Sequence, residues 1–449
     1  RRHAAPPLLG DGALRRRFLD ALPFEPTAAQ RRVAAEIESD LARPHPMLRL
    51  VQGDVGSGKT VVAALAVLQA VEAGCQAALM APTELLAEQH LNSFRAWLEP
   101  LGVPLLWLSG RLKGAARREA VARLREMGPG LVIGTHALFQ EDVQYRDLGL
   151  VIVDEQHRFG VHQRLALRDK GDDGGSRPHQ LVMTATPIPR TLAMTAYADL
   201  DLSVIDELPP GRQPVTTAAV PDSRREEVIG RIAAACREGR RVYWVCTLIE
   251  ESEALQCQAA TDTARELAER LEGVRVGLVH GRLAAPEKEA VMRAFAAGEI
   301  DLLVATTVIE VGVDVPEASL MIIENAERLG LAQLHQLRGR VGRGTRRSDC
   351  LLLYHPPLGE TARARLAIMR ETCDGFAIAR RDLELRGPAE LLGTRQAGLA
   401  RMRIADLLRD SALIPKAARA AAELEAKAPE CIDPLVRRWV SDAINYGHV

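Results

Sequence analysis

The sequence predicts an α/β protein in which two tandem parallel-sheet domains are followed by a mostly helical C-terminal domain. Three observations predict this fold class. Short aliphatic runs alternate with helix-length segments, which is the pattern of β-α-β units and of a parallel sheet. This pattern occurs twice, on either side of a proline-rich stretch. Residues 356–449 then show a mostly helical pattern.

We expect the first domain at residues 1–208. Its aliphatic runs contain almost no alternating polar residues, which predicts strands that are buried on both faces of a sheet. These runs lie at residues 47–53, 75–82, 131–135, 148–155 and 179–186.

A linker is predicted at residues 207–214, "ELPPGRQP", because this stretch holds three prolines and one glycine. We expect the second domain at residues 215–355, where the plan of the first domain is repeated. Its aliphatic runs lie at residues 240–247, 274–281, 301–308, 319–326 and 350–354. The C-terminal domain, 356–449, is expected to be helical with a loop at 385–398.

The composition is that of a soluble globular protein without a membrane segment. Hydrophobic residues make up 47% and charged residues 26%, and the longest apolar stretch, Val61 to Val71, is too short to cross a bilayer. The seven cysteines are scattered without a C-x-x-C pair, which indicates free thiols in the cytoplasm and no zinc site. No signal-like segment opens the chain, and its first residue is Arg, so we expect a piece of a longer protein.

Residues 53–60, "GDVGSGKT", fit the phosphate-binding loop G-x-x-x-x-G-K-[ST] (P-loop). The loop follows a predicted strand and opens a predicted helix, where backbone N–H groups surround phosphate oxygens. Only six of the 58 basic residues are lysines, so a lysine in this loop is informative. We expect it to bind ATP through Gly53, Asp54, Val55, Gly56, Ser57, Gly58, Lys59 and Thr60.

Two carboxylates end the aliphatic run "LGLVIVDE". Asp154 is placed to hold Mg²⁺ together with the hydroxyl of Thr60. Glu155 is the natural base to polarise the attacking water. The sequence therefore predicts ATP hydrolysis with Mg²⁺ as cofactor.

The P-loop together with "DEQH" at 154–157 resembles the superfamily 2 helicases and translocases, whose two sheets are RecA-like. The resemblance implies that Phe24 stacks on the adenine and that Gln30 reads it. "ATTVIEVGVDVP" (305–316) resembles the motif that touches both nucleotide and strand, which implies nucleotide contacts at Gly312 and Asp314. Strand contacts or coupling are implied for Thr83, Thr135, His136, Thr184, Thr186, Thr306 and Thr307.

"QLRGRVGRGTRR" (336–347) holds five arginines in a chain whose formal net charge is −1. The resemblance implies that Arg340 and Arg343, assisted by Gln336, reach across the cleft to the γ-phosphate. The guanidinium fork suits this role because it stays charged and bonds two phosphate oxygens. Such an arginine finger is worth roughly 10³–10⁵ in rate. Hydrolysis would then open and close the cleft and move the protein along a nucleic-acid backbone.

The finer resemblance is to the RecG-type ATP-dependent DNA helicases. It rests on "DEQHRFGVHQR" (154–164), "ENAERLGLAQLHQLRGRVGRG" (324–344) and "DGFAIARRDLELRGPAELLGTRQAG" (374–398), which resembles the TRG motif of that family. It implies that Arg365, Arg386 and Gln396 couple cleft closure to translocation on duplex DNA. The N-terminal wedge region of that family is not found in this sequence.

The resemblance implies a monomeric bacterial protein of the cytoplasm and nucleoid. Its partner would be duplex or branched DNA, bound independently of sequence, in repair and recombination. Two alternatives stay open. The motor of a transcription-repair coupling factor shares the TRG element, but "DEQH" in place of a DEEH form favours the RecG type. A nucleotide switch that does not hydrolyse ATP would predict damage at Lys59, Glu155 or the arginines, and these residues are intact.

Overall fold

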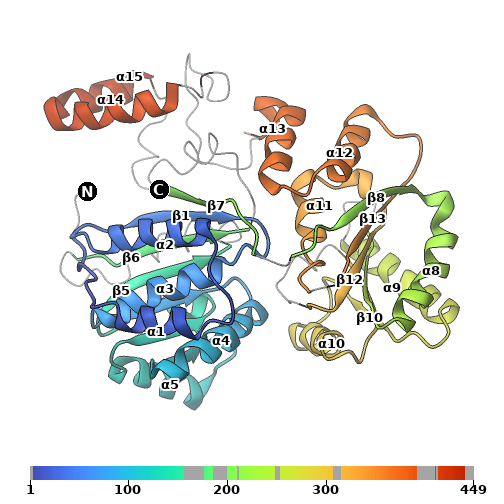
Figure 1. Cartoon of the computed structure of the whole chain (residues 1–449), viewed down its shortest axis with the longest axis horizontal. Coiled ribbons are helices and arrows are strands. Elements are labelled where there is room, and N and C mark those ends of the chain that lie inside the picture. The colour runs from blue at the N-terminus through green and yellow to red at the C-terminus, as the bar shows by residue number, and fades with distance from the viewer. Residues whose placement is uncertain are drawn as a thin grey trace.

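The computed structural model describes residues 4–155, 176–185, 200–209, 212–247, 253–306, 315–344, 346–391, 410 and 413–439. Two sheets lie beside each other, each covered by helices, and a further group of helices follows (Figure 1). We call the part around the first sheet lobe 1, residues 4–209, and the part around the second sheet lobe 2, residues 212–354. The predicted fold class is confirmed. The boundaries at 208, 215 and 355 stay predictions.

Lobe 1 contains a seven-stranded sheet in the order β3-β4-β2-β5-β6-β1-β7, and every pairing in it is parallel. The strands are β1 (Leu48–Gly53), β2 (Gln76–Met80), β3 (Leu105–Leu108), β4 (Gly130–Gly134), β5 (Leu148–Asp154), β6 (His179–Thr184) and β7 (Asp201–Ile205). The helices are α1 (Ala13–Ala21), α2 (Ala28–Leu41), α3 (Lys59–Glu72), α4 (Glu84–Leu98) and α5 (Gly114–Glu126), with short 3₁₀ turns η1 (Glu99–Leu101) and η2 (His136–Phe139).

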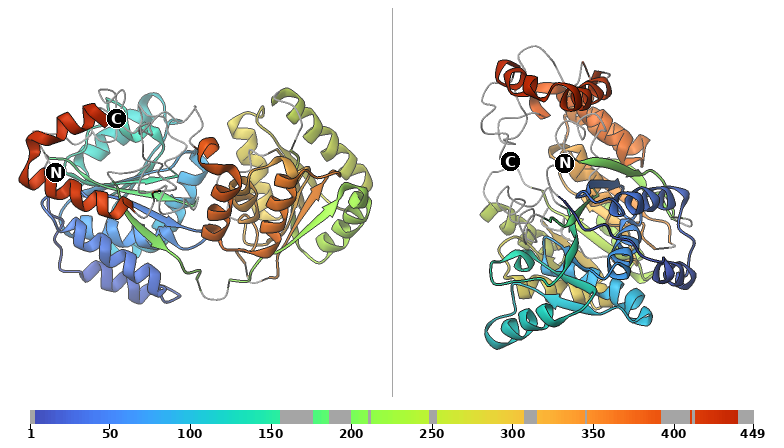
Figure 2. Two further views of the ribbon diagram at one scale, coloured as in Figure 1. Left: turned by 90° about the horizontal axis from the view of Figure 1, so that it is seen from above. Right: turned by 90° about the vertical axis from the view of Figure 1, so that its left-hand side faces the viewer.

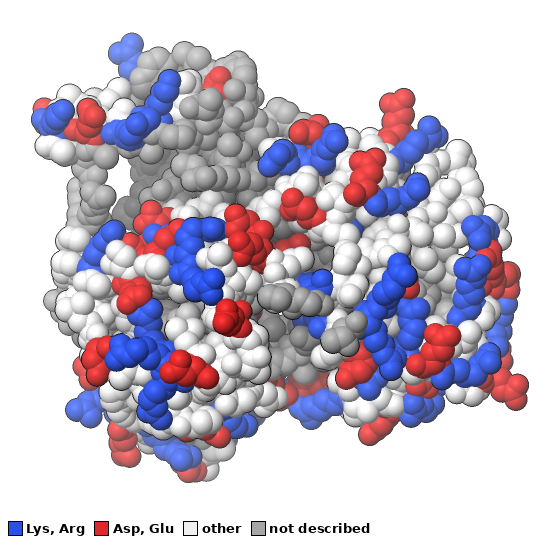
Figure 3. All heavy atoms as spheres, in the orientation of Figure 1, with Lys and Arg blue, Asp and Glu red and all other residues white. Residues whose placement is uncertain are grey.

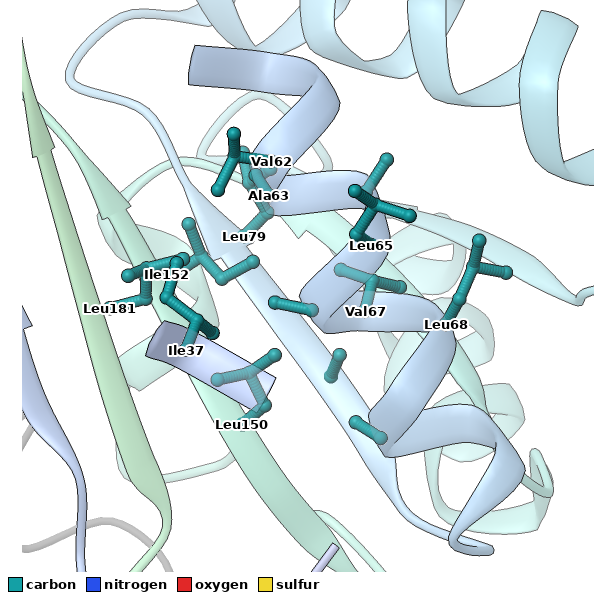
Figure 4. Packing of buried hydrophobic residues seen from close by; sticks show 14 of the residues in the cluster. Ile37, Val62, Ala63, Leu65, Val67, Leu68, Leu79, Leu150, Ile152 and Leu181 are labelled. Atoms are coloured by element: carbon teal, nitrogen blue, oxygen red, sulfur yellow. The ribbon is translucent and has the colours of Figure 1, made fainter. Parts of the chain in front are cut away.

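Helix α3 is the centre of the lobe 1 core. It is buried at every position from Val61 to Ala70, as expected for a helix that is apolar all round. Its side chains pack against the central strands through residues such as Leu79, Ile152 and Leu181, and against Ile37 of α2 (Figure 4). This packing fixes the N-terminal end of α3, and therefore the P-loop, relative to the strand ends.

Lobe 2 contains a six-stranded parallel sheet in the order β10-β11-β9-β12-β13-β8. Its strands are β8 (Thr216–Pro221), β9 (Arg241–Val245), β10 (Val276–Val279), β11 (Leu302–Ala305), β12 (Ala318–Ile323) and β13 (Asp349–Tyr354). Its helices are α8 (Arg225–Arg237), α9 (Glu253–Arg270), α10 (Ala285–Ala297) and α11 (Leu331–Arg338), with 3₁₀ turns η4 (Asp222–Arg224) and η6 (Ala326–Arg328). Separate apolar clusters pack on the two faces of this sheet.

The C-terminal portion is helical, as predicted. It contains α12 (Glu360–Glu371), α13 (Gly375–Leu391), α14 (Ile414–Lys427) and α15 (Ile432–Trp439), with a 3₁₀ turn η8 (Pro429–Cys431). Helices α12 and α13 form a hairpin that packs on lobe 2 through Leu366, Met369 and Ile378. Helices α14 and α15 lie over lobe 1 in both Figure 1 and Figure 2. One detail differs from the expectation: α13 continues to Leu391, so the loop predicted from residue 385 begins as helix.

All ten predicted strands are present, and the structure adds β3, β7 and β8. The three additional strands are edge strands: β3 and β7 form the two edges of the first sheet and β8 forms one edge of the second.

Candidate nucleotide site between the two lobes

A cleft of about 480 Å³ lies between the two lobes. This volume falls within the range of about 300–1,000 Å³ that is typical of ligand sites. Lobe 1 contributes the P-loop and the ends of β5 and β6, and lobe 2 contributes α11 and the turn after it. The lining includes, among the predicted residues, Val55, Gly56, Gly58, Lys59, Thr60, Asp154, Glu155, Gln336, Arg340 and Arg343.

The P-loop connects the end of β1 to the start of α3. Gly56 and Gly58 have φ angles of 74° and 80°, a backbone conformation that glycine adopts without strain. A Cβ atom on Gly58 would lie 2.1 Å from Nε2 of Gln30, so this turn has no space for a side chain. The Lys59 ammonium donates hydrogen bonds to the carbonyls of Gly53 (2.8 Å) and Asp54 (3.0 Å). The ammonium of Lys59 therefore lies against the backbone of the P-loop, next to the place where a phosphate would bind.

The charges around Lys59 come from both lobes. Burial lowers the pKa of Lys59, while Glu155 and Asp154 oppose this shift and Arg343 adds to it. The ammonium therefore lies among carboxylates of lobe 1 and within the field of an arginine of lobe 2. An added polyanion such as a triphosphate would be attracted by both cations.

Asp154 and Glu155 lie side by side at the carboxyl end of β5, but their surroundings differ. Asp154 is buried, and its Oδ2 lies 2.8 Å from Nε2 of His90 on α4. Glu155 has a φ angle of 52°, which is unusual for a residue with a side chain and is typical of strain at functional sites. Its carboxylate accepts hydrogen bonds from the N–H of Ala185 (3.0 Å) and the hydroxyl of Thr184 (3.4 Å).

A Mg²⁺ ion fits the donor set of this cleft. Thr60 and Asp154 both line it, and Mg²⁺ usually binds through one or two protein oxygens together with nucleotide phosphates and water. Among the described residues, no group of three or more His, Cys, Asp or Glu side chains could hold a metal ion by itself. The ion would thus depend on the nucleotide for the rest of its ligands.

The lobes come into close contact where the P-loop meets the end of α11. A Cβ atom on Gly339 would lie 2.9 Å from Cβ of Val55, so only a residue without a side chain allows this approach. Arg343 donates from Nε to the carbonyl of Gly339 (3.1 Å). A hydrogen bond of 2.7 Å also joins His335 of α11 to Asp54 of the P-loop. The P-loop is therefore held from both sides of the cleft.

The two residues expected to contact adenine differ in accessibility. Phe24 is 44% exposed and is accessible for stacking. Gln30 is buried, and its amide is already engaged: Oε1 accepts from the N–H of Thr27 and Nε2 donates to the carbonyl of Ser57 (both 2.8 Å). Gln30 thus supports the P-loop in this structure, and reading a base would require the amide to exchange partners.

Two predicted strand-contact residues occupy equivalent places in the two lobes. Thr135 follows β4 and Thr306 follows β11, and each of these strands lies next to an edge strand, β3 or β10. Both threonines are buried, and neither hydroxyl meets a hydrogen-bond partner within the described part of the chain. His136, the next residue in lobe 1, is exposed. Thr83 caps the N-terminal end of α4, where its hydroxyl accepts from the N–H of Leu86 (3.4 Å).

The coupling residues are described only in part. Arg365 of α12 donates to the carbonyl of Leu329 (2.7 Å) and so joins the hairpin to the segment before α11. Arg386 belongs to α13, and its side chain lies outside what the structure describes. Other predicted positions also lie outside the described residues: Thr186, Thr307, Gly312, Asp314 and Gln396.

Three residues at the site were missed by the sequence reasoning: His90, Arg212 and His335. His90 ends the stretch "APTELLAEQH" (81–90), which also contains the predicted strand contact Thr83, so its place in that stretch was an available signal. Arg212 of the linker donates to the carbonyl of Val55. His335 precedes the predicted arginine motif by one residue. For Arg212 and His335, nothing in the sequence pattern indicated a contact with the P-loop.

Three family models match the chain. A model described as DEAD/DEAH box helicase matches residues 27–195, and one described as helicase conserved C-terminal domain matches 225–345. A third, described as ATP-dependent DNA helicase RecG, domain 3, C-terminal, matches 372–437. The chain is 62% identical over 448 residues to an ATP-dependent DNA helicase RecG of Escherichia coli O157:H7. Over its whole length the chain is similar to RecG helicases.

The match to the E. coli RecG covers 100% of this chain and 65% of that protein. A RecG of Bacillus subtilis is 46% identical over 435 residues, which are 95% of this chain and 63% of that protein. The chain thus spans just under two thirds of the length of these RecG relatives. The resemblance to the RecG family that the motifs indicated is confirmed.

Solved structures agree with the fold. A structure of RecG bound to a three-way DNA junction has a TM-score of 0.77 and 44% identity, and the match covers 92% of this chain and 53% of that chain. A structure of Saccharomyces cerevisiae Dbp5 bound to RNA and ADP BeF₃ has a TM-score of 0.58 at 18% identity, which shows a shared fold alone. The two sheets are RecA-like, as in these RecG and helicase structures. None of the described helices is long and apolar enough to cross a membrane.

Proposed function

We propose that this chain is the motor of a RecG-type DNA helicase, which couples ATP hydrolysis to movement on duplex or branched DNA. One observation carries the proposal: a single cleft is lined by Lys59, Asp154 and Glu155 from lobe 1 and by Arg340 and Arg343 from lobe 2. These are the groups that phosphoryl transfer to water requires, and they are divided between two bodies. The names of the relatives agree with this activity.

We propose the following division of labour for hydrolysis. Lys59 and the backbone N–H groups of the P-loop bind the phosphates, and Glu155 accepts a hydrogen bond from the attacking water and orients it. Arg340 and Arg343 stabilise the charge that develops on the γ-phosphate oxygens. Thr60 and Asp154 would hold Mg²⁺, which would further neutralise the charge of the phosphates. The bonds from Thr184 and Ala185 orient the carboxylate of Glu155 for its role with the attacking water.

Movement on DNA would follow from the division of the site between lobes. Because the γ-phosphate is contacted from both sides, its loss weakens the attraction between the lobes. Thr135 and Thr306 are the proposed backbone contacts, one in each lobe, since a buried hydroxyl without a protein partner is suited to a phosphate oxygen. Opening and closing would then change the distance between two grips on one strand.

The proposed DNA contacts are local ones. Lys and Arg side chains are interspersed with Asp and Glu over the face seen in Figure 3. Several of the arginines are paired, for example Arg225 with Glu266 and Arg270 with Glu226. A surface of this kind gives little long-range attraction. Recognition would therefore depend on backbone contacts that are independent of sequence.

We further propose branched DNA as the preferred partner, because a RecG relative is bound to a three-way junction in its solved structure. We propose a monomeric protein that acts on replication and recombination intermediates in the bacterial cytoplasm and nucleoid.

The test is the steady-state ATPase rate without DNA and with single strands, duplex and a three-way junction. We expect duplex or junction DNA to stimulate turnover. Lys59→Ala should abolish turnover and leave the melting temperature unchanged. Turnover by Lys59→Ala at the rate of the unchanged chain would remove the P-loop assignment, and a rate that no DNA increases would count against a DNA motor.

A further inference from the structure

His335 makes a contact that the proposed mechanism does not use. It lies on α11 of lobe 2 and is buried, with only 4% of its surface exposed. Its Nε2 lies 2.7 Å from Oδ1 of Asp54 in the P-loop of lobe 1. The next residue, Gln336, lines the nucleotide cleft, whereas His335 does not belong to the lining. His335 therefore faces the back of the P-loop and not the place of the nucleotide.

The proton positions in this contact follow from the neighbouring arginine. Nη2 of Arg338 lies 3.2 Å from Nδ1 of His335. A guanidinium group only donates hydrogen bonds, so Nδ1 accepts and the ring proton lies on Nε2. Nε2 then donates to the carboxylate of Asp54. The imidazole thus joins a fixed cation to a fixed anion, and each hydrogen bond polarises the other.

Both ends of this Arg338–His335–Asp54 chain are anchored. Arg338 is buried and donates from Nη1 to the carbonyls of Met369 (2.8 Å) and Thr372 (2.9 Å) at the end of α12. At the other end, Oδ1 of Asp54 also accepts from the N–H of Val55 (2.6 Å). Arg338 is thus held within lobe 2 by two carbonyls, and Asp54 is held within the P-loop of lobe 1 by one N–H, so the chain joins the two lobes at a defined place.

The carboxylate of Asp54 is charged in this setting. Burial by itself would raise the pKa of Asp54, but the hydrogen bonds from His335 and from the N–H of Val55, together with the charge of Arg212, lower it below its usual value. A buried carboxylate in the P-loop would repel phosphates if it faced them. Its hydrogen bonds direct it toward lobe 2 instead, where it serves as an attachment point.

We propose that His335 is a positioning residue for ATP turnover. It ties the P-loop to α11 and thereby sets the separation across which Arg340 and Arg343 reach the nucleotide. This inference rests on the ATPase activity proposed above. It goes beyond that proposal because it places the control of lobe alignment in a residue that touches neither nucleotide nor DNA.

The test uses two substitutions at His335 and one at its partner. His335→Leu removes both hydrogen bonds and keeps an apolar body of similar size. His335→Gln keeps an N–H donor near the position of Nε2. Asp54→Asn keeps the acceptor for Val55 and removes the charge that His335 meets. His355→Leu is the matched control, because His355 also pairs with an aspartate, Asp222, but at the surface and directly after β13, the last strand of lobe 2.

We expect His335→Leu to lower kcat by about 10- to 100-fold, since misplacement of reacting groups by about 1 Å costs up to about 10²-fold. The affinity for fluorescent MgADP, which depends mainly on lobe 1, should change less than about threefold. His335→Gln should recover part of kcat, and His355→Leu should equal the unchanged chain. Because the two residues act through one contact, adding Asp54→Asn to His335→Leu should cost little more than His335→Leu alone.

A second measurement does not depend on turnover. Spin labels on α5 of lobe 1 and α8 of lobe 2 report the separation of the lobes, and His335→Leu should lengthen and broaden the distance distribution. An unchanged distribution together with unchanged kcat would overturn the proposal. In another outcome, His335→Leu and His335→Gln would lose the same amount of kcat and fall equally in melting temperature, and the distance between the labels would not change. His335 would then be needed for folding only. If the unsubstituted chain shows no ATP turnover but His335→Leu still changes the distance distribution, the result would count against the proposed function. It would not count against the contact between His335 and Asp54 as a link between the lobes.

Discussion

The contact between Gly339 and Val55 allows a quantitative prediction for Gly339→Ala. The backbone of Gly339 has φ −66° and ψ −8°, which alanine adopts without strain, so the effect must come from the added methyl group. That carbon would lie 2.9 Å from both Cβ and Cγ2 of Val55 and 3.1 Å from its Cγ1. Carbon atoms in contact are ordinarily about 3.5–4.0 Å apart. The P-loop and α11 must therefore separate by several tenths of an ångström or more.

The magnitude follows from the cost of overpacking, about 1–3 kcal/mol for an added group in a close-packed place. If this cost is borne by the aligned state of the lobes, the population of that state falls by about 5- to 150-fold. We expect kcat of DNA-stimulated ATP hydrolysis to fall by a factor in this range. Each lobe should keep its stability, since the clash lies between the lobes and is relieved by their separation.

The assay is steady-state ATP turnover with saturating duplex DNA, together with thermal unfolding. Val55→Ala combined with Gly339→Ala should recover part of kcat because it removes Cγ1 and Cγ2 but leaves Cβ. The matched control is Gly230→Ala on the exposed face of α8, where an added Cβ meets nothing within 4 Å. It should leave turnover unchanged and stabilise the helix by about 0.5–1 kcal/mol. Turnover by Gly339→Ala within twofold of the unchanged chain would refute the reasoning.

Four further predictions concern other parts of the molecule. His90→Ala should raise the Mg²⁺ concentration that gives half-maximal turnover by about 10- to 100-fold, because His90 orients Asp154. Titration of the rate with Mg²⁺ checks this. Leu79→Ala, at a fully buried position of β2, should lower the free energy of unfolding by about 2–5 kcal/mol, measured by urea denaturation. Burial lowers the pKa of His179, whose ring accepts from the N–H of Met47 and donates to the carbonyl of Pro6. The unfolded chain therefore binds this proton more readily, and the free energy of unfolding should fall as pH drops below about 6.5; urea unfolding from pH 7.5 to 5.5 should show a smaller fall in His179→Gln. Gln396→Ala should leave most DNA-stimulated ATPase and abolish movement on duplex DNA, and equal loss of both in a triplex-displacement assay would contradict a coupling role.

Buried central strands were predictable from the sequence, and most edge strands were not. The strand β5 reads LGLVIVD and is buried at six of its seven positions, so its aliphatic run is unbroken. By contrast, β7 reads DLSVI and β8 reads TTAAVP, and most of their residues are partly or fully exposed. A strand with one neighbour needs fewer apolar residues, and its sequence resembles that of a loop. The end of α13 was missed for another reason: Gly387 and Pro388 indicate a turn, but the helix continues past them.

The candidate site shows a similar division. Lys59, Asp154 and Glu155 were predictable because the chemistry requires these residue types at strand ends and in a glycine-rich loop. Contacts between the lobes were not predictable, since Asp54 and His335 are 281 positions apart in the sequence and neither residue type implies the other. Gln30 shows a further limit: its type fits recognition of a base, while its amide is engaged by the P-loop in this structure.

The connection between the lobes leaves the first sheet from β7 and enters the second through β8, and both are edge strands. If the proposed motor stalls against an obstacle, the mechanical load acts across this connection and therefore on two strands that each have a single neighbour. In lobe 1 that neighbour is β1, paired with β7 over five residues, and β1 ends in the P-loop. Tension on the linker consequently passes from β7 to β1, the strand that carries the phosphate-binding loop, before it reaches any other strand of the first sheet. Mechanical load could therefore act directly on the rate of ATP hydrolysis.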